Sequence, residues 1–402
     1  MNVVISAGGR FHAHHLAHEL HHHNSLQKLF TFDYTAADNG RVPPTHVHCV
    51  TSCKIMNDLF VRFRGARFFN KASFNIIKDN LFDRMVSNQL QRLEACDIFV
   101  GWAHYAHQSM QVAKQRGALV IIESGSCHIL AQQEILHNEY ARLGVPFHSI
   151  HPATIDKMLS EYADADYIMT LSHFAQQSFI AQGVPTHKVL RVPCGIDIDY
   201  FRSMQSVHKK KFRVIFTGLV SLRKGVHHLI DAWHQARLPL EQTELLIVGA
   251  MQKDFATIMP TLTIPNNVRF VGPIARPALR ELYHQSSLFV LPSLEDGFGM
   301  VIGEAMASGL PVICTTSSAG PELIKEGISG LLVPPGDSAS IAQRLEWCFT
   351  HQNELTFMGL QGQQDIAAFS WQRYGDAIYA MYQGLLGKAG TTNALTKALH
   401  GN

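Results

Sequence analysis

The chain has 402 residues, more than one hydrophobic core usually serves, so its length predicts two domains. Hydrophobic residues make up 46% and charged residues 16%, which excludes a disordered chain and is typical of a globular one. The net charge of +2 gives no electrostatic case for nucleic-acid binding. Seven scattered cysteines, no signal-like start and no run of ~18 apolar residues predict a cytoplasmic protein with reduced thiols.

Short apolar runs followed by helical or turn-rich sequence fill the first half of the chain. Residues 12–23 are predicted to form a helix, and four runs are predicted to be buried strands: 2–9, 97–102, 118–125 and 165–172. Apolar strands that alternate with helices indicate a parallel sheet covered on both faces.

A second series of apolar runs begins at residues 211–218, after the polar segment 197–211, which is predicted to be a linker. The later strands of this series are predicted at 244–249, 267–272, 287–293, 310–316 and 330–336. The fold class is therefore α/β, with two doubly wound parallel-sheet domains that face an interdomain cleft. The predicted boundaries are 1–198, 199–368 and a C-terminal helix and tail, 369–402, packing back on the N-terminal domain.

The stretch "LPSLEDGFGMVIGEAM", residues 291–306, joins a predicted strand to a predicted helix through the loop "LEDGFG". Gly297 and Gly299 would let the backbone approach a ligand closely. The amides of Gly299, Met300 and Val301 would form a helix N-terminus, which attracts anions such as phosphate. Asp296 in the loop and Glu304 one turn inside the helix could then accept hydrogen bonds from sugar or ribose hydroxyls.

Two cations follow another predicted strand, where "TGLVSLRKG" places Arg223 and Lys224 just before the next helix. Each charge-assisted contact with a phosphate contributes roughly 1.5–3 kcal/mol. Hydroxyl acceptors and phosphate donors together are the profile of a nucleotide-sugar pocket.

On these residues the C-terminal half resembles the retaining glycosyltransferases of family 4, which have the GT-B fold. The resemblance rests on "PSLEDGFGMVIGEAMASGLPVI", "VPCGIDIDYF", "RVIFTGLVSLRKG", "NVRFVGPI" and "SAGPELIKEGISGLLVPPGD". It covers about 180 residues strongly and the N-terminal half more weakly. It implies transfer of a sugar from a nucleotide diphosphate sugar to a glycan or lipid-linked acceptor, with retained anomeric configuration, in cell-surface polysaccharide synthesis.

The resemblance also implies roles for individual residues. Gly8 and Gly9 correspond to a glycine loop that approaches the diphosphate and the acceptor, and His128 would lie by the transferred sugar. The catalytic residues are then His128, Arg223, Lys224 and Asp296. The donor-binding residues are Gly8, Gly9, Pro273, Ile274, Gly297, Phe298, Gly299, Met300, Val301 and Glu304. No cofactor or catalytic metal is expected, because Arg223, Lys224 and the helix amides would stabilise the leaving phosphate.

Two positions depart from the family pattern. Asp296 stands where the family has its first glutamate, one methylene longer, and Leu219 stands where the family often has an arginine. Arg223, beside Lys224, could supply the missing phosphate contact. These departures bear on the choice of donor.

Two other segments invite functional readings. His14, His18 and His22 follow one another at helical i,i+4 spacing, but no acidic or cysteine ligand completes a metal site, so a solvent-facing helix is predicted. His12 could instead reach an acceptor. Residues 59–78, "LFVRFRGARFFNKASFNIIK", mix basic and aromatic residues, which is typical of a membrane-surface element or of a helix whose aromatics face the core.

Three other functions compete with this one. A nucleotide-sugar epimerase or hydrolase can share the fold but needs no acceptor. A dinucleotide-dependent oxidoreductase would need a Gly-x-Gly-x-x-Gly turn, which "SAGGRFHAHH" does not supply. The third is a non-catalytic homologue that only binds the nucleotide sugar, which the aspartate at 296 leaves open.

Overall fold

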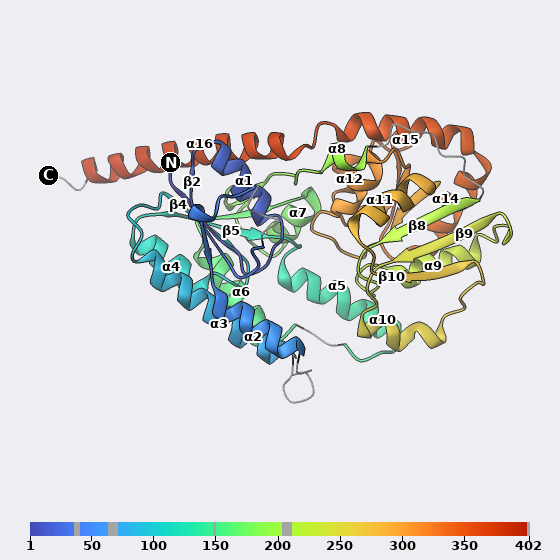
Figure 1. Ribbon diagram of the computed structural model, residues 1–402, viewed down its shortest axis with the longest axis horizontal. Coiled ribbons are helices and arrows are strands. Elements are labelled where there is room, and N and C mark those ends of the chain that lie inside the picture. Colours follow the sequence, from blue (N-terminus) through green and yellow to red (C-terminus); the bar gives the residue numbers. More distant parts are fainter. Residues whose placement is uncertain (36–40, 63–70, 148–149, 203–210, 400–402) are drawn as a thin grey trace.

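The computed structural model describes residues 1–35, 41–62, 71–147, 150–202 and 211–399. Within these ranges the chain forms two parallel β-sheets, each flanked by helices, and the two domains lie side by side along the long axis (Figure 1). The predicted fold class of two Rossmann-like α/β domains is confirmed.

The N-terminal sheet has seven strands in the described residues, in the order β3-β2-β1-β4-β5-β6-β7. Its strands are β1 (Val3–Ser6), β2 (Leu26–Thr31), β3 (Val47–Cys49), β4 (Ile98–Trp102), β5 (Leu119–Ser124), β6 (Tyr167–Thr170) and β7 (Val189–Arg191). Its helices are α1 (Ala13–His22), α2 (Thr51–Arg62), α3 (Lys71–Leu90), α4 (His107–Gln115), α5 (Ile129–Arg142), α6 (Pro152–Asp164) and α7 (His173–Ala181), with 3₁₀ turns η2 (Pro44–His46) and η4 (Thr186–Lys188).

The second sheet has six strands in the order β10-β9-β8-β11-β12-β13, counted over the same described ranges. Its strands are β8 (Phe212–Thr217), β9 (Thr243–Val248), β10 (Val268–Gly272), β11 (Leu288–Leu291), β12 (Val312–Thr315) and β13 (Leu331–Val333). The helices are α8 (Ile198–Phe201), α9 (Val226–Gln235), α10 (Lys253–Ile258), α11 (Arg276–Gln285), α12 (Met300–Ala307), α13 (Gly320–Leu323), α14 (Ser338–Thr350), α15 (Gln352–Ile366) and α16 (Trp371–Leu399), with the 3₁₀ turn η5 (Met259–Thr261).

The central strands are continuous apolar runs because helices cover both faces of each sheet. Every residue of β1, β4, β11 and β12 is buried. A parallel strand buried on both faces has no polar side to alternate with, so its sequence loses the period-2 pattern of a half-exposed strand. Burial of this apolar surface is the main force that holds each domain together.

The chain passes between the two domains twice, and the two passages lie against each other. The amide of Ile196 donates a 2.7 Å hydrogen bond to the carbonyl of Phe369. A Cβ on Gly195 would lie 2.5 Å from the Cα of Trp371, so the two backbones are in direct contact there. The predicted linker 197–211 is partly helical, since α8 lies in it, while 203–210 fall outside the described residues.

After the second passage, α16 runs back over the N-terminal domain, as Figure 1 shows. It packs along α1, where the ring of Trp371 stacks on His15 with centroids 3.8 Å apart and His23 Nε2 lies 3.0 Å from Asp376 Oδ1. This packing buries Tyr374 and Tyr382 against the N-terminal domain.

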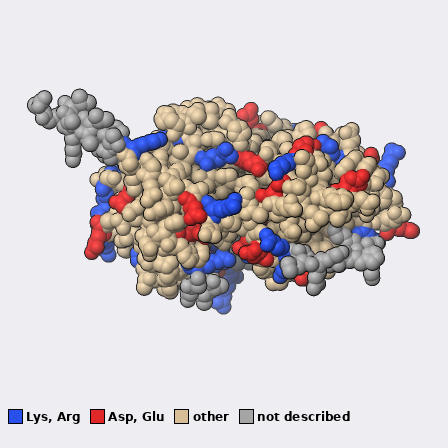
Figure 2. Space-filling view, turned by 90° about the horizontal axis from the view of Figure 1, so that it is seen from above, with Lys and Arg blue, Asp and Glu red and all other residues tan. Residues whose placement is uncertain are grey.

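The surface agrees with the small net charge. On the face in Figure 2, basic and acidic side chains are interspersed over a mostly uncharged surface. Of the helices in the described ranges, none combines the length and apolar composition needed to cross a bilayer. All seven cysteines are free thiols.

Candidate functional site

The predicted donor-binding residues lie where the strand order of the second sheet reverses. β8 and β11 are neighbours in that sheet but lie far apart in sequence, and the chain proceeds outward from them in opposite directions. Arg223 and Lys224 follow β8, and residues 295–299 follow β11. Loops at the carboxyl ends of such strands bind ligands in open α/β sheets.

Arg223 is held by Glu295, the residue before Asp296. Its Nη1 donates a 2.6 Å hydrogen bond to Glu295 Oε1, whose side chain is completely buried. Two side chains of the N-terminal domain also bond this carboxylate: Gln132 Nε2 at 2.7 Å and Ser126 Oγ at 2.8 Å. Sequence reasoning missed this role, because two of the partners of Glu295 come from the other domain.

These contacts keep Glu295 ionised. Burial alone would raise the pKa of its carboxyl, but the charge of Arg223 and the bonds from Arg223, Gln132 and Ser126 together lower that pKa to about 2. Burial alone would lower the pKa of the Arg223 guanidinium, but the charge of Glu295 outweighs it and raises that pKa. The interface between the domains therefore contains a charged pair with its hydrogen bonds satisfied.

Lys224 pairs with Asp296 on the same side of the loop. Lys224 Nζ bonds Asp296 Oδ2, and both side chains are largely buried. A Cβ placed on Gly299 would lie 3.6 Å from that oxygen, so the N-terminus of α12 lies beside the pair. Gly299 is its N-cap, with a φ of 81° that few other residues adopt. The structure thus brings together Lys224, Asp296 and the first amides of α12.

Glu304 lies one turn inside α12, near α11. The pKa of its carboxyl is raised to about 7, chiefly by burial and also by Asp197, against the opposing effects of Arg276 and a hydrogen bond from Tyr283. Arg276 begins α11, directly after the loop that holds Pro273 and Ile274. The predicted base-contacting loop and the predicted diol acceptor are thus neighbours.

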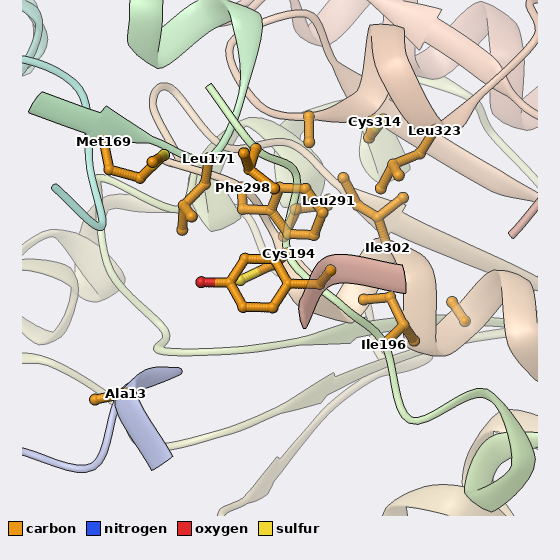
Figure 3. Packing of buried hydrophobic residues seen from close by; sticks show 14 of the residues in the cluster. Ala13, Met169, Leu171, Cys194, Ile196, Leu291, Phe298, Ile302, Cys314 and Leu323 are labelled. Carbon is orange, nitrogen blue, oxygen red and sulfur yellow. The ribbon is translucent and has the colours of Figure 1, made fainter. Parts of the chain in front are cut away.

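Two loop residues are packed tightly against the rest of the protein. A Cβ on Gly297 would lie 2.1 Å from the carbonyl oxygen of Gly125, so the lack of a side chain there makes room for the N-terminal domain. Phe298 is 2% exposed, and Figure 3 shows its ring beside Leu291 in the hydrophobic core. Its side chain anchors the loop, which leaves only its backbone for a donor. Met300 and Val301 are half-buried.

In the N-terminal domain, Gly8 and Gly9 follow β1, which is at the strand-order reversal of its own sheet. A Cβ on Gly8 would overlap the ring of Tyr105, at 2.2 Å, so the glycine there is required by packing. His12 is buried and its Nε2 lies 3.3 Å from Glu123 Oε2.

His128 is the N-cap of α5. Its Nδ1 accepts a 3.2 Å hydrogen bond from the amide of Leu130, and its ring packs against both Tyr162 and Phe179. Burial lowers its pKa to about 4, so the imidazole is neutral at physiological pH. This gives His128 a structural role, and its place beside a transferred sugar stays a prediction.

The helix α5 contributes several interdomain contacts, and sequence reasoning did not single it out. Besides Gln132, its Tyr140 hydroxyl donates a 3.0 Å hydrogen bond to Asp254 Oδ2, and Glu139 contacts α9. Positions 132 and 139 are seven residues apart, so they lie on one face of the helix. Figure 1 shows α5 reaching from the first domain toward the second.

The remaining predictions have mixed outcomes. His14 is 2% exposed, so the predicted solvent-facing helix is wrong at this position: α1 packs against the sheet and α16. His18 and His22 do remain at the surface, with their Nε2 atoms 3.2 Å apart.

Leu219 is 47% exposed in the loop after β8. In the basic-aromatic stretch, residues 63–70 lie outside the described residues, while Phe60 and Phe74 stack at 3.9 Å.

Comparison with known proteins agrees with this geometry. Residues 198–365 match the family model of glycosyl transferases group 1. The chain is 27% identical over 255 residues to a D-inositol 3-phosphate glycosyltransferase of Catenulispora acidiphila, covering 58% of this chain and 61% of that one. It is 26% identical over 190 residues to an amylovoran biosynthesis glycosyltransferase of Erwinia amylovora, covering 45% and 47%. The chain thus spans about half to three fifths of these relatives.

Solved structures match over nearly the whole chain. A sucrose-phosphate synthase from Thermosynechococcus elongatus superposes with a TM-score of 0.68 at 17% identity, covering 96% of this chain and 100% of that one. The Anabaena protein HepE, in complex with UDP and glucose, superposes with a TM-score of 0.67 at 17% identity and the same coverage. The chain therefore has the two-domain GT-B fold of these proteins, and its residues 198–365 match the group 1 glycosyl transferases.

Proposed function

We propose that the protein is a retaining glycosyltransferase that moves a hexosyl group from a nucleotide diphosphate sugar to a glycan or lipid-linked acceptor in cell-surface polysaccharide synthesis. The observation that carries this is the convergence of Lys224, the N-terminus of α12 and the Arg223–Glu295 pair at one strand-order reversal. Glu304 lies one helical turn further along α12. The relatives named for glycosyl transfer and the UDP and glucose bound to HepE support the same reading.

In this proposal the domains divide the substrates. The C-terminal domain holds the nucleotide sugar, with Pro273 and Ile274 at the base and Glu304 at the ribose. The N-terminal domain holds the acceptor near Gly8 and Gly9. Lys224, Arg223 and the α12 amides stabilise the negative charge that grows on the leaving diphosphate, so fixed cations serve where other enzymes use a metal ion. Asp296 positions Lys224 and faces the donor sugar.

The direct test is to incubate the protein with several nucleotide sugars and measure nucleoside diphosphate release with and without candidate acceptors. Donors are first ranked by the thermal shift they produce. A transferase releases diphosphate faster when its acceptor is present, whereas a hydrolase is indifferent to it. An epimerase or a binding-only homologue releases none with any acceptor, and that result would sink the proposal.

Replacing Glu304 with alanine should weaken donor binding by about tenfold or more, because the hydroxyl hydrogen bonds to a charged acceptor are lost. Calorimetric titration with the best donor measures this, and Glu346→Ala, an exposed glutamate on α14, is the control. Equal affinity in Glu304→Ala and wild type would remove Glu304 from the donor site.

The same carboxyl predicts a pH dependence. Its pKa is about 7, above its ordinary value, so it is mostly protonated at pH 6 and mostly ionised at pH 8. The ionised form accepts both hydroxyl hydrogen bonds, and wild-type affinity should therefore rise by about tenfold between pH 6 and pH 8. Glu304→Gln should lack this rise. A wild-type profile as flat as that of Glu304→Gln would contradict the assignment.

We also propose that the paired helices α2 and α3 contact the inner membrane surface peripherally. Ile55 and Leu59 lie one turn apart on α2 and are 53% and 47% exposed, and Ile77 on α3 is 61% exposed. Apolar side chains at this spacing share one helix face. In sequence they flank the basic and aromatic residues 63–70, and such a combination favours an anionic lipid surface.

In a co-sedimentation assay, the protein should bind vesicles of phosphatidylcholine and phosphatidylglycerol. The double variant Ile55→Ser/Leu59→Ser should bind about tenfold more weakly, because two apolar side chains no longer enter the interface. Ile328→Ser/Phe357→Ser removes two exposed apolar residues of the C-terminal domain and is the matched control. Absence of vesicle binding, or equal losses in both double variants, would refute the contact.

A further inference from the structure

Three buried side chains with metal-binding atoms meet where α5 of the N-terminal domain contacts α9 of the C-terminal domain. Glu139 is near the end of α5, and His227 and His228 are in the first turn of α9. One ligand atom from each lies within 4.8 Å of the others. Over the described part of the chain, this is the group of three or more such side chains with metal-ligand spacing.

The distances suit a small divalent ion. His227 Nε2 lies 2.7 Å and His228 Nε2 lies 3.1 Å from the same oxygen, Glu139 Oε1. In a tetrahedral zinc site with ordinary bond lengths, the ligand atoms are about 3.3–3.5 Å apart. An outward shift of well under 1 Å would therefore admit the ion. Two imidazoles and one carboxylate are a ligand set that zinc uses in proteins.

Hydrogen bonding accounts for only part of the cluster. His228 Nε2 is buried and lies 3.1 Å from Glu139 Oε1, an oxygen that His227 Nε2 and Arg142 already bond, and it is not well placed for a hydrogen bond of its own there. Because the two histidines are adjacent on a helix, their side chains would normally diverge, but their ring centroids lie 4.2 Å apart. Both rings are thus turned toward one point, which leaves a ring nitrogen available to a further partner.

The surroundings resemble the outer shell of a metal site. His228 Nδ1 lies 3.2 Å from Ser338 Oγ, and Arg142 bonds both oxygens of Glu139. Such second partners orient metal ligands and fix the tautomer of a histidine.

A cavity of about 600 Å³ adjoins the cluster, and both histidines and Arg142 line it together with Asp337 and Ser338. It gives an ion a route to the three ligands. It also leaves room for a water molecule at the fourth coordination position, which three-ligand zinc sites keep open.

We propose that Glu139, His227 and His228 bind one zinc-class divalent ion that joins the two domains. Histidine nitrogens favour zinc, cobalt or nickel over magnesium and calcium, which prefer oxygen ligands. Arg142 and the N-terminus of α9 place positive charge nearby, which limits the affinity. The ion has no part in the proposed transfer step, where Arg223 and Lys224 stabilise the leaving phosphate.

The test measures Zn²⁺ binding by calorimetry after chelator treatment. His18 and His22 are a surface pair that could also take up zinc, so the reference protein is the variant His18→Ala/His22→Ala. It should bind one equivalent of Zn²⁺ and no Mg²⁺. Adding His227→Ala/His228→Ala should abolish that equivalent, and Glu139→Gln should weaken it at least tenfold. His234→Ala, which alters the same cavity outside the cluster, should keep it.

Two further measurements test whether the zinc is bound at this site and by folded protein. Co²⁺ added to the reference protein should give the visible absorption of a tetrahedral nitrogen–oxygen site, and saturating Zn²⁺ should raise its thermal midpoint. Circular dichroism checks that each variant is folded. The proposal is overturned if the reference protein binds no Zn²⁺, or if the cluster variants, folded, bind it as tightly as the reference.

Discussion

Lys224→Ala is expected to lower kcat by about 10²-fold while the protein stays folded. Removing one preorganised donor from a site where negative charge develops typically costs 10²–10³ in rate, or roughly 3–4 kcal/mol. If Lys224 acts on the leaving diphosphate, the loss falls on kcat more than on KM, because the charge grows only on the way to the transition state. Steady-state release of nucleoside diphosphate measures both constants.

The structure supplies the controls for this experiment. Lys224 is paired with Asp296, so its removal also leaves a largely buried carboxylate without its partner. The double variant Lys224→Ala/Asp296→Asn removes both charges. It separates the effect of losing the cation from the effect of leaving the carboxylate unpaired. Lys253→Ala, an exposed lysine on α10, should behave as wild type. An unchanged kcat in folded Lys224→Ala would remove Lys224 from the reaction.

Glu295→Ala should destabilise the protein by about 3 kcal/mol, because it leaves Arg223 partly buried without its counter-charge and unties two side chains of the other domain. For a domain of this size the thermal midpoint should fall by roughly 6–12 °C. Glu295→Gln keeps the hydrogen-bonding shape without the charge and should lose less. Glu346→Ala, exposed on α14, should lose almost nothing.

The pKa of Glu295 also predicts how this contribution to stability depends on pH. It is about 2 in the folded protein, below its ordinary value of 4.5. The stabilisation is therefore complete above about pH 4.5 and is lost as the pH falls toward 2. Wild type and Glu295→Ala should accordingly converge in thermal midpoint on acidification. Midpoints that already coincide at pH 7 would show that this pair does not hold the domains together.

Much of the fold could be predicted because buried parallel strands have a simple signature. The runs around Val3–Ser6, Ile98–Trp102 and Leu288–Leu291 are almost entirely apolar, and each one is a strand. β3, "VHC", and β7, "VLR", were missed, since each is a three-residue strand that includes a polar residue, whereas the three-residue edge strand β13, "LLV", is wholly apolar and was predicted. β2, "LQKLFT", was missed because Gln27 and Lys28 interrupt its apolar run.

The residues of the candidate site differ in how well the sequence alone predicts them. Arg223, Lys224, Asp296 and Glu304 could be found because each lies near others in a short motif. Glu295 could not be distinguished from its neighbour, since its partners Ser126 and Gln132 are more than 160 positions away. The reason for glycine at 297 was likewise hidden, because the backbone that it accommodates belongs to the other domain. Long-range contacts of this kind leave no local trace in a sequence.

The two passages between the domains have a consequence for motion. Because Ile196 is hydrogen-bonded to Phe369, and Gly195 touches Trp371, the chain crosses between the domains through two segments that contact each other, rather than through one isolated linker. Two joined crossings favour a clamshell rotation about one axis over a free twist. A rotation that opens the domains would then separate Glu295 from Gln132. The reverse rotation would bring the same two side chains back together in the same geometry.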